Sequence, residues 1–132
     1  MLLTACSTNS LTTNQSSLYQ TLGSEQGIKQ IVDNLVIKIS KDKQVFPYFA
    51  KASVSHFKQG LEMHFCAISN GPCEYTGDSM VDIHTGMNIN EADFNRLVEL
   101  LVEVMEESGV KYTTQNKLLA ELAPMRAEII KI

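Results

Sequence analysis

The chain has 132 residues, of which 44% are hydrophobic, and carries a formal net charge of -4 at pH 7. This length and composition fit one domain with a single packed core and argue against a disordered chain. Acidic and basic residues are interspersed, so a basic stripe for nucleic acid is not expected. After the first few residues, no apolar run approaches the roughly 18 residues of a membrane span.

The first seventeen residues differ in character from the rest. Leu3-Thr4-Ala5-Cys6 has the form of a bacterial lipobox, in which the cysteine is lipid-modified, and a polar stretch follows as far as Ser17. Such a stretch cannot bury enough apolar surface to fold. Only five residues precede Cys6, so either the signal starts further upstream or the match is chance. We expect residues 1–17 to be a tether and residues 18–132 to be the folded domain.

The next segments have helical spacing. Ser24 is expected to cap a first long helix, and Pro47 should break the chain before Tyr48-Phe49. The apolar face of this helix recurs at steps of three and four residues and comprises Ile28, Ile31, Val32, Leu35, Val36 and Ile39. A second helix should start near Ser53 or Ser55 and end at Asn70-Gly71-Pro72. Its apolar stripe comprises Phe57, Leu61, His64, Phe65 and Ile68.

Two more helices follow. Asn90 is a good cap for a helix that Ser108-Gly109 closes, and its apolar face comprises Phe94, Leu97, Val98, Leu101, Val104 and Met105. The last helix is expected to begin through Thr113-Thr114, and Pro124 should kink or break it. Strand alternation does not compete anywhere, so the fold is predicted to be all-α. Periodicity alone predicts four or five helices packed together and does not indicate a function.

Between the second and third of these helices lies His84, framed by Gly77 and Gly86. This region and four others resemble, in order, group 1 truncated haemoglobins over roughly residues 18–130. The matching segments are Leu18-Tyr19-Gln20-Thr21-Leu22-Gly23, Ile31-Val32-Asp33, Pro47-Tyr48-Phe49, Gly71-Pro72 with Tyr75-Thr76-Gly77, and Leu122-Ala123-Pro124-Met125. The resemblance implies a truncated globin, a two-over-two helical sandwich around haem b (iron protoporphyrin IX).

The resemblance also assigns roles to residues. His84 would bind the iron as a neutral imidazole whose other ring nitrogen donates to a backbone carbonyl. Phe49 would stack on the haem. The other expected haem contacts are Phe57, Leu61, His64, Phe65, Tyr75, Met80, Ile89 and Phe94. His64 would touch the haem edge or a propionate, with sixth ligation of the iron as the alternative, and His56 would be solvated. Candidate propionate partners are Tyr75, Lys58 and Lys51.

On the distal side the chain departs from its relatives. Many of them place a Tyr in the first long helix and a Gln or His on the distal helix, where this chain has Val36, Phe57 and Leu61. These side chains, which with Leu35 would form the distal pocket, cannot donate a hydrogen bond. The loss of a buried donor should weaken bound dioxygen by roughly 1–3 kcal/mol. Carbon monoxide and nitric oxide depend less on such donors.

The leading hypothesis is therefore a haem protein that binds dioxygen, nitric oxide or carbon monoxide and has an unidentified electron donor. Nitric oxide dioxygenation, which turns nitric oxide and dioxygen into nitrate, is the enzymatic alternative. A peroxidase-like activity would need a distal acid–base group, and only His64 is placed to supply one. A haem-free helical lipoprotein that serves as an interaction module is the alternative from another class.

Cys66 and Cys73 are seven residues apart. In a continuous helix their Cα atoms would be about 10.5 Å apart, too far for a bridge. A reversal at Gly71-Pro72 would bring them within the roughly 4.4–6.8 Å that a disulfide needs, whereas a redox-sensor pair or two unrelated thiols are the alternatives. The spacing resembles a Cys-x6-Cys arrangement in some proteobacterial truncated haemoglobins. With a lipidated Cys6 it favours a periplasmic or membrane-anchored protein, and a chance lipobox would favour the cytoplasm.

Overall fold

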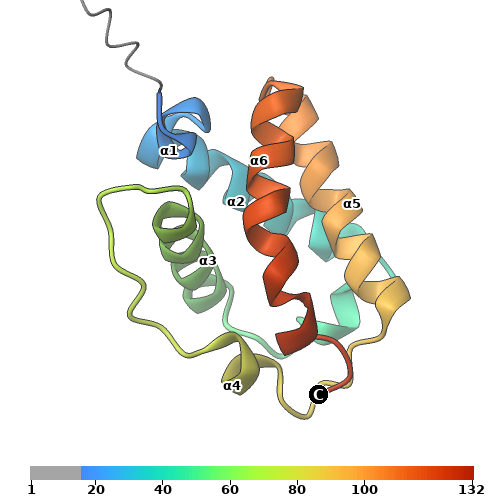
Figure 1. The fold of residues 1–132 in the computed structure, drawn as a ribbon. Helices are drawn as coiled ribbons and strands as arrows, with labels where there is room; N and C mark the ends of the chain where they lie inside the picture. The colour runs from blue at the N-terminus through green and yellow to red at the C-terminus, as the bar shows by residue number, and fades with distance from the viewer. Residues whose placement is uncertain (1–15) are drawn as a thin grey trace, which may run out of the picture.

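The computed structural model describes residues 16–132, so the proposed lipidation of Cys6 lies outside the described residues. Six α-helices and two short 3-10 helices follow one another in this part of the chain (Figure 1). They are α1 (Leu18–Thr21), α2 (Ser24–Lys41), η1 (Phe46–Tyr48), α3 (Val54–Ile68), α4 (Met80–His84), α5 (Glu91–Glu107), α6 (Tyr112–Leu122) and η2 (Ala123–Glu128). Within residues 16–132 the β pairing is limited to one isolated bridge between Ile89 and Ile130. The all-α prediction is confirmed. None of the described helices is both long and apolar enough to cross a membrane.

The start of α2 differs from the prediction. Ser24 is the first residue of the helix, and Gly23, with φ 96°, takes the capping position without a side-chain hydrogen bond. Before it, Ser17 and Gln20 form a reciprocal capping box that starts the short helix α1, which apolar spacing did not reveal because it has a single turn. Only glycine fits at position 27, where the first turn of α2 packs against the end of α1, since a Cβ there would lie 2.1 Å from the Leu22 carbonyl oxygen.

Other helix ends follow the sequence. The Ser53 hydroxyl accepts the His56 N–H at the start of α3, and Asn90 Oδ1 accepts the Asp93 N–H at 2.8 Å at the start of α5. The helix α6 begins at Tyr112 rather than at the Thr113-Thr114 pair. It ends at Leu122, and the chain continues as the 3-10 helix η2 around Pro124, which is the local break that the proline predicts.

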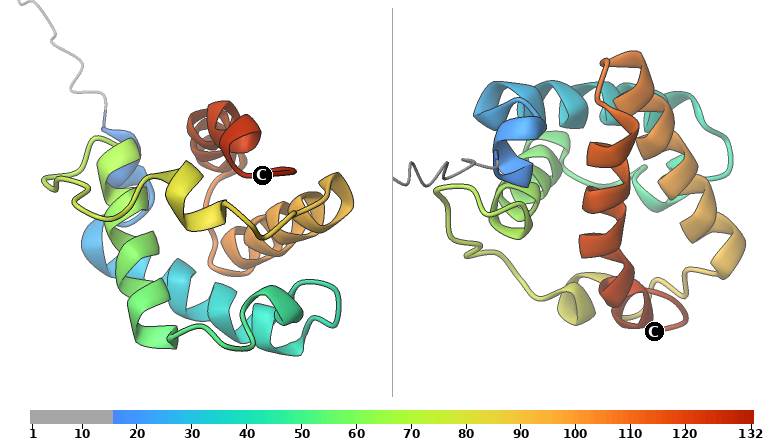
Figure 2. Two further views of the ribbon diagram at one scale, coloured as in Figure 1. Left: turned by 90° about the horizontal axis from the view of Figure 1, so that it is seen from below. Right: turned by 45° about the horizontal axis from the view of Figure 1, so that its top comes forward.

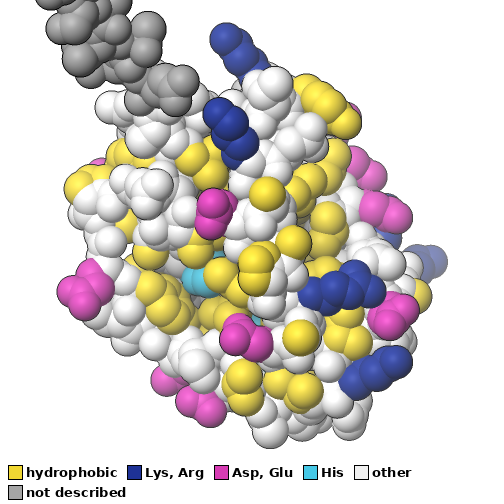
Figure 3. Space-filling view, in the orientation of Figure 1, with side chains coloured by type: hydrophobic (Ala, Val, Ile, Leu, Met, Phe, Trp, Pro, Cys, Tyr) yellow, Lys and Arg dark blue, Asp and Glu magenta, His cyan; other side chains and the backbone are white. Residues whose placement is uncertain are grey.

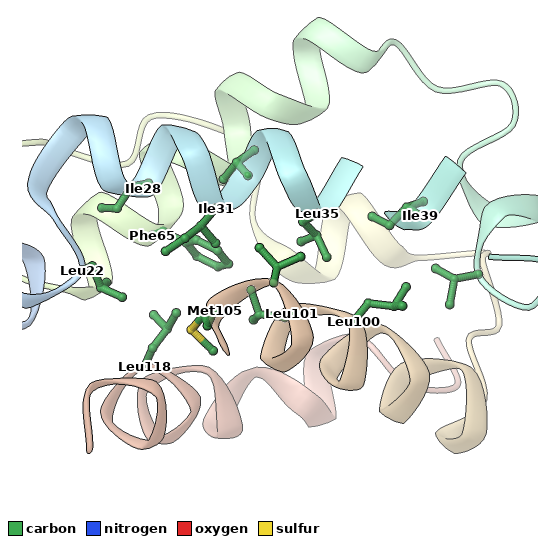
Figure 4. Packing of buried hydrophobic residues seen from close by; sticks show 13 residues of the cluster. Leu22, Ile28, Ile31, Leu35, Ile39, Phe65, Leu100, Leu101, Met105 and Leu118 are labelled. Carbon is green, nitrogen blue, oxygen red and sulfur yellow. The ribbon is translucent and has the colours of Figure 1, made fainter. Parts of the chain in front are cut away.

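The core lies where α2 crosses α5 and meets α3 (Figure 4). Four helices supply most of its buried side chains, which are Ile28, Ile31, Val32, Leu35 and Ile39 of α2, Phe65 of α3, Leu100, Leu101, Val104 and Met105 of α5, and Leu118 of α6. Because α2 also packs on α3 while α5 runs beside α6, two helix pairs stack on each other (Figures 1 and 2). This is the two-over-two arrangement.

The segment between α3 and α5 has a different character. It runs from Asn70 to Asn90 through an extended loop and the five-residue helix α4, which contributes no buried residue. Figure 2 shows α4 lying across one end of the sandwich, between α3 and the C-terminal part of the chain. Of the other helices, α4 packs mainly against η2.

Candidate functional site

His84 is the last residue of α4 and is half-buried. Ser79 starts this helix by accepting the Asp82 N–H at 3.1 Å, and the His84 Nδ1 lies 2.7 Å from the Met80 carbonyl oxygen. A carbonyl can only accept, so the proton of a neutral His84 ring belongs on Nδ1. The lone pair is then on Nε2, the ring nitrogen that does not contact the Met80 carbonyl. This is the orientation that a metal-binding histidine requires.

Across from α4, His64 of α3 is a buried histidine with an exposed fraction of 8%. Its Nε2 lies 3.1 Å from the Met125 Sδ, and its ring meets the Tyr75 ring edge-on at 5.3 Å between centroids. Burial lowers the pKa of His64, which keeps the ring neutral at pH 7. Burial, followed by the charge of Asp78, raises the pKa of Tyr75, and the phenol donates to the Asp78 carbonyl at 2.6 Å.

These contacts bring α3, the 70–79 loop and η2 together around one face of the molecule. Figure 3 shows histidine side chains on this face, set in a recess among hydrophobic side chains between the α3 side and the α6 side. Met125 belongs to one of the segments that carry the resemblance, but the sequence does not indicate it as a site residue. The signal that could have identified it is Pro124, because the helix break that follows from the proline turns the next side chain toward α3.

A small apolar cavity lies at the other end of α3. Its volume is about 60 Å³, and it is lined by Val36, Ile39, Ser40, Phe46, Phe49, Ala52, Val54 and Phe57. Phe49 and Phe57 meet edge-to-face at 4.9 Å between ring centroids, and the Ser40 hydroxyl donates to the Ile37 carbonyl at 2.6 Å. The structure therefore brings together three residues predicted for the haem and its distal side, Phe49, Phe57 and Val36, in a setting without a free donor.

Other predicted residues lie elsewhere. Leu35 and Phe65 are each only 2% exposed and belong to the hydrophobic core (Figure 4). Leu61 is half-buried and packs against that core, and Met80 is half-buried at the start of α4. The sequence predicts Leu35 for the distal pocket, and in the structure this side chain points from α2 toward α5 (Figure 4). Helical spacing predicts which residues share a face of the helix. It does not predict which of them pack in the core and which contact a cofactor.

The remaining candidates are held by other contacts or are exposed. Ile89 is buried and forms the bridge to Ile130, while Phe94 has the Arg126 guanidinium over its ring at 5.2 Å. Of the proposed propionate partners, Lys58 is paired with Asp33 at 3.2 Å and Lys51 is exposed. His56 is exposed, in agreement with its assignment as a solvated residue.

Cys66 and Cys73 form a disulfide with a Cα–Cα distance of 6.2 Å. The chain reverses between them, where the Gly71 N–H donates to the Cys66 carbonyl at 2.8 Å. A Cβ on Gly71 would lie 2.6 Å from both the Cys66 Sγ and the Tyr19 ring, so only glycine fits beneath the bridge. The disulfide joins the end of α3 to the loop that leads to His84.

The donor set agrees with a haem. Among the described residues, no group of three or more His, Cys, Asp or Glu side chains is arranged to hold a metal ion. The described residues instead fit haem iron, to which the porphyrin itself would supply nitrogen ligands. They offer the Nε2 of His84, an aromatic pair at Phe49 and Phe57, and a neutral His64. The residues present therefore fit the group that the resemblance implies.

Comparison with known proteins agrees with this geometry. The chain is 29% identical over 115 residues to a group 1 truncated hemoglobin of Nostoc sp., covering 87% of this chain and 98% of that protein. It is 26% identical over 114 residues to a group 1 truncated hemoglobin of Mycolicibacterium paratuberculosis, covering 86% and 84%. The crystal structure of truncated hemoglobin from Tetrahymena pyriformis superposes with a TM-score of 0.85 at 24% identity, covering 89% of this chain and 100% of that one.

The structural match supports the two-over-two fold, and the sequence matches confirm the resemblance to group 1 truncated haemoglobins. The family model described as bacterial-like globin matches residues 17–131. The chain therefore belongs to the bacterial-like globin family.

Proposed function

We propose that this protein binds haem b through His84 and takes up diatomic gases on a distal side without hydrogen-bond donors. The observation that carries the proposal is the 2.7 Å contact between the His84 Nδ1 and the Met80 carbonyl oxygen. It assigns the proton to Nδ1, fixes the ring and leaves Nε2 as a nitrogen ligand for iron. The similarity to proteins called truncated hemoglobins supports the same conclusion.

When bound through His84, haem would supply an iron that can take up a diatomic gas. The chain's own residues hold and surround this group. Met80 orients His84 through its backbone carbonyl. Phe49 and Phe57, which pack together near the start of α3, offer aromatic surface to the haem. His64 and Met125 add a neutral, polarisable surface where α3 faces η2.

The apolar lining of the cavity near Val36 bears on which gases are held well. Dioxygen gains stability from a buried hydrogen-bond donor, and Val36, Phe49 and Phe57, which line this cavity, have none to offer. We therefore propose that the protein binds dioxygen loosely. The missing donor should weaken the binding of carbon monoxide and nitric oxide less. The peroxidase-like alternative is not favoured, because the Nε2 of His64 is already in contact with the Met125 Sδ.

The disulfide supports an additional proposal about location. Disulfides persist in oxidising compartments, so the pairing of Cys66 with Cys73 favours an exported protein, and a lipidated Cys6 would attach it to a membrane. Metabolic labelling with a fatty acid should mark the wild-type protein and not Cys6→Ala. Equal labelling of both proteins, or of neither, would contradict the lipid anchor.

The binding proposal is tested by titrating the purified protein with haem. We expect a Soret band that saturates at one haem per chain, and a ferrous protein whose spectrum changes on addition of carbon monoxide. Absence of saturable haem uptake would overturn the proposal and favour the haem-free interaction module.

A further inference from the structure

The last four residues of the chain pair with the segment that follows His84. We call residues 129–132 the C-terminal segment and residues 80–89 the proximal segment. The Ile132 backbone oxygen accepts the N–H groups of Gly86 at 3.1 Å and Asn88 at 3.2 Å, and the Lys131 N–H donates to the Ile89 carbonyl at 2.9 Å. Ile89 and Ile130 form the parallel bridge. Figure 1 shows the two segments side by side at the C-terminus.

Hydrophobic burial does little to fix the proximal segment. Its helix α4 has no buried residue, and Val81 and Ile83 on it are 45% and 44% exposed. Ile89 is the buried side chain of this segment, and it lies at the bridge itself. The helix α4 packs mainly against η2, which comes just before the C-terminal segment. Residues 123–132 therefore contact the proximal segment both at α4 and after His84.

The backbone conformation is specific to this pairing. Gly86 has φ 87°, Asn88 has φ 50° and Lys131 has φ 61°, so three residues in or beside these hydrogen bonds lie in the left-handed region. Glycine and asparagine accept this region readily, whereas lysine adopts it at a cost. The strained lysine indicates that the pairing has to be held by its hydrogen bonds and by the burial of Ile89.

From these contacts we infer that the C-terminal segment positions His84: it sets the geometry of the histidine toward iron and slows the loss of haem. The inference rests on the proposed function, because it concerns the same ligand. The hydrogen bonds begin two residues after His84, so a shift of the C-terminal segment moves the end of α4 directly. The segment acts through the backbone, and no side chain of residues 129–132 needs to touch the haem.

The experiment compares Lys131→Pro with Lys131→Gly in the haem-loaded protein. Both variants lose the lysine side chain and its 4.0 Å contact with Glu91. Proline also removes the N–H that donates to Ile89 and forces φ to about -65°, whereas glycine keeps the N–H and accepts the positive φ. A deletion of Lys131 and Ile132 removes this hydrogen bond and the two that the Ile132 oxygen accepts from Gly86 and Asn88, without imposing a new conformation.

The measurements are the iron–histidine stretching band of the ferrous protein and the rate of haem transfer to an excess of an apo-globin acceptor. We expect Lys131→Pro and the deletion to lose haem about 10-fold faster than wild type, with a displaced or broadened band. Lys131→Gly should match wild type in both. Wild-type bands and rates in Lys131→Pro and in the deletion would overturn the inference.

Circular dichroism separates positioning from folding. If Lys131→Pro loses helix content, the deletion decides, since residues 131 and 132 lie outside every helix. Loss of helix content in the deletion as well would contradict the inference, because the segment would then support the whole fold. A wild-type protein without an iron–histidine band would instead refute the proposed function, so the two failures are distinguishable.

Discussion

The frame of this molecule and the segment that carries His84 are stabilised in different ways. In the frame, α2 contributes five buried residues and α5 four, and their side chains interlock in one core. In the proximal segment, α4 contributes none, and its position depends on a cap at Ser79, the bond from His84 to Met80, the pairing with residues 129–132 and the nearby disulfide. A site built in this way can be altered without loss of the fold.

The largest effect should separate these two regions with the same substitution. Ile31 in α2 is 1% exposed and Ile83 in α4 is 44% exposed. Ile31→Ala should lower the free energy of unfolding by about 2–5 kcal/mol, because it leaves a cavity in the core. Ile83→Ala should change it by no more than about 0.5 kcal/mol. Urea unfolding followed by circular dichroism measures both, and equal losses would contradict the comparison.

The disulfide should have the next largest effect. Replacing Cys66 and Cys73 together by serine frees a short loop, which should lower the free energy of unfolding by about 2–3 kcal/mol through the entropy of the unfolded chain. Wild type unfolded under reducing conditions is the matched control and should reach the same midpoint. An unchanged midpoint in the double variant would show that the bridge adds no stability.

A substitution in the distal cavity should act on gas binding. Val36→Tyr places a phenol beside Phe49 and Phe57, where the lining has no free donor. The release of dioxygen should slow by about 10-fold, which corresponds to a buried hydrogen bond of about 1.4 kcal/mol, and carbon monoxide release should change much less. Flash photolysis and stopped-flow mixing measure these rates, with Val36→Phe as the control without a hydroxyl. If wild type already releases dioxygen slowly and Val36→Tyr does not change that rate, another hydrogen-bond donor is present. His64 would then be the first residue to test.

A smaller effect should appear as a dependence of stability on pH. Burial lowers the pKa of His64 in the folded protein, so below about pH 6.5 the unfolded chain binds a proton that the folded one does not. The free energy of unfolding should therefore fall as the pH drops below that point, until the folded pKa is reached. His64→Phe should flatten this part of the profile, and His56→Phe, on an exposed residue, should not. Parallel slopes in wild type and His64→Phe would contradict the assignment.

The same contrast explains what could be predicted from the sequence. Apolar residues at steps of three and four identified α2, α3, α5 and α6, since a core needs a continuous face and a face leaves a periodic pattern. The helix α1 could not be predicted from apolar spacing, because a single turn is too short to show a period. Leu35 is predicted for the distal pocket and packs in the core of the structure, because periodicity does not say which neighbour a face meets.

The site is predictable in part for a similar reason. His84 could be singled out by the glycines around it and by the resemblance, and Pro124 indicated the break that yields η2. The pairing of residues 86–89 with 129–132 could not be predicted, because it uses backbone groups that every residue has. The contact between His64 and Met125 also depends on tertiary structure, since the two residues are 61 positions apart.

The central claim is that the His84 Nε2 binds the haem iron, and the resonance Raman spectrum of the ferrous protein tests it most directly. Wild type should show an iron–histidine stretching band. The band should be absent from His84→Gly, return when imidazole is added to that variant, and persist in His64→Phe. A band that survives in His84→Gly without imidazole, or that disappears in His64→Phe alone, would contradict the account and assign the iron to another histidine.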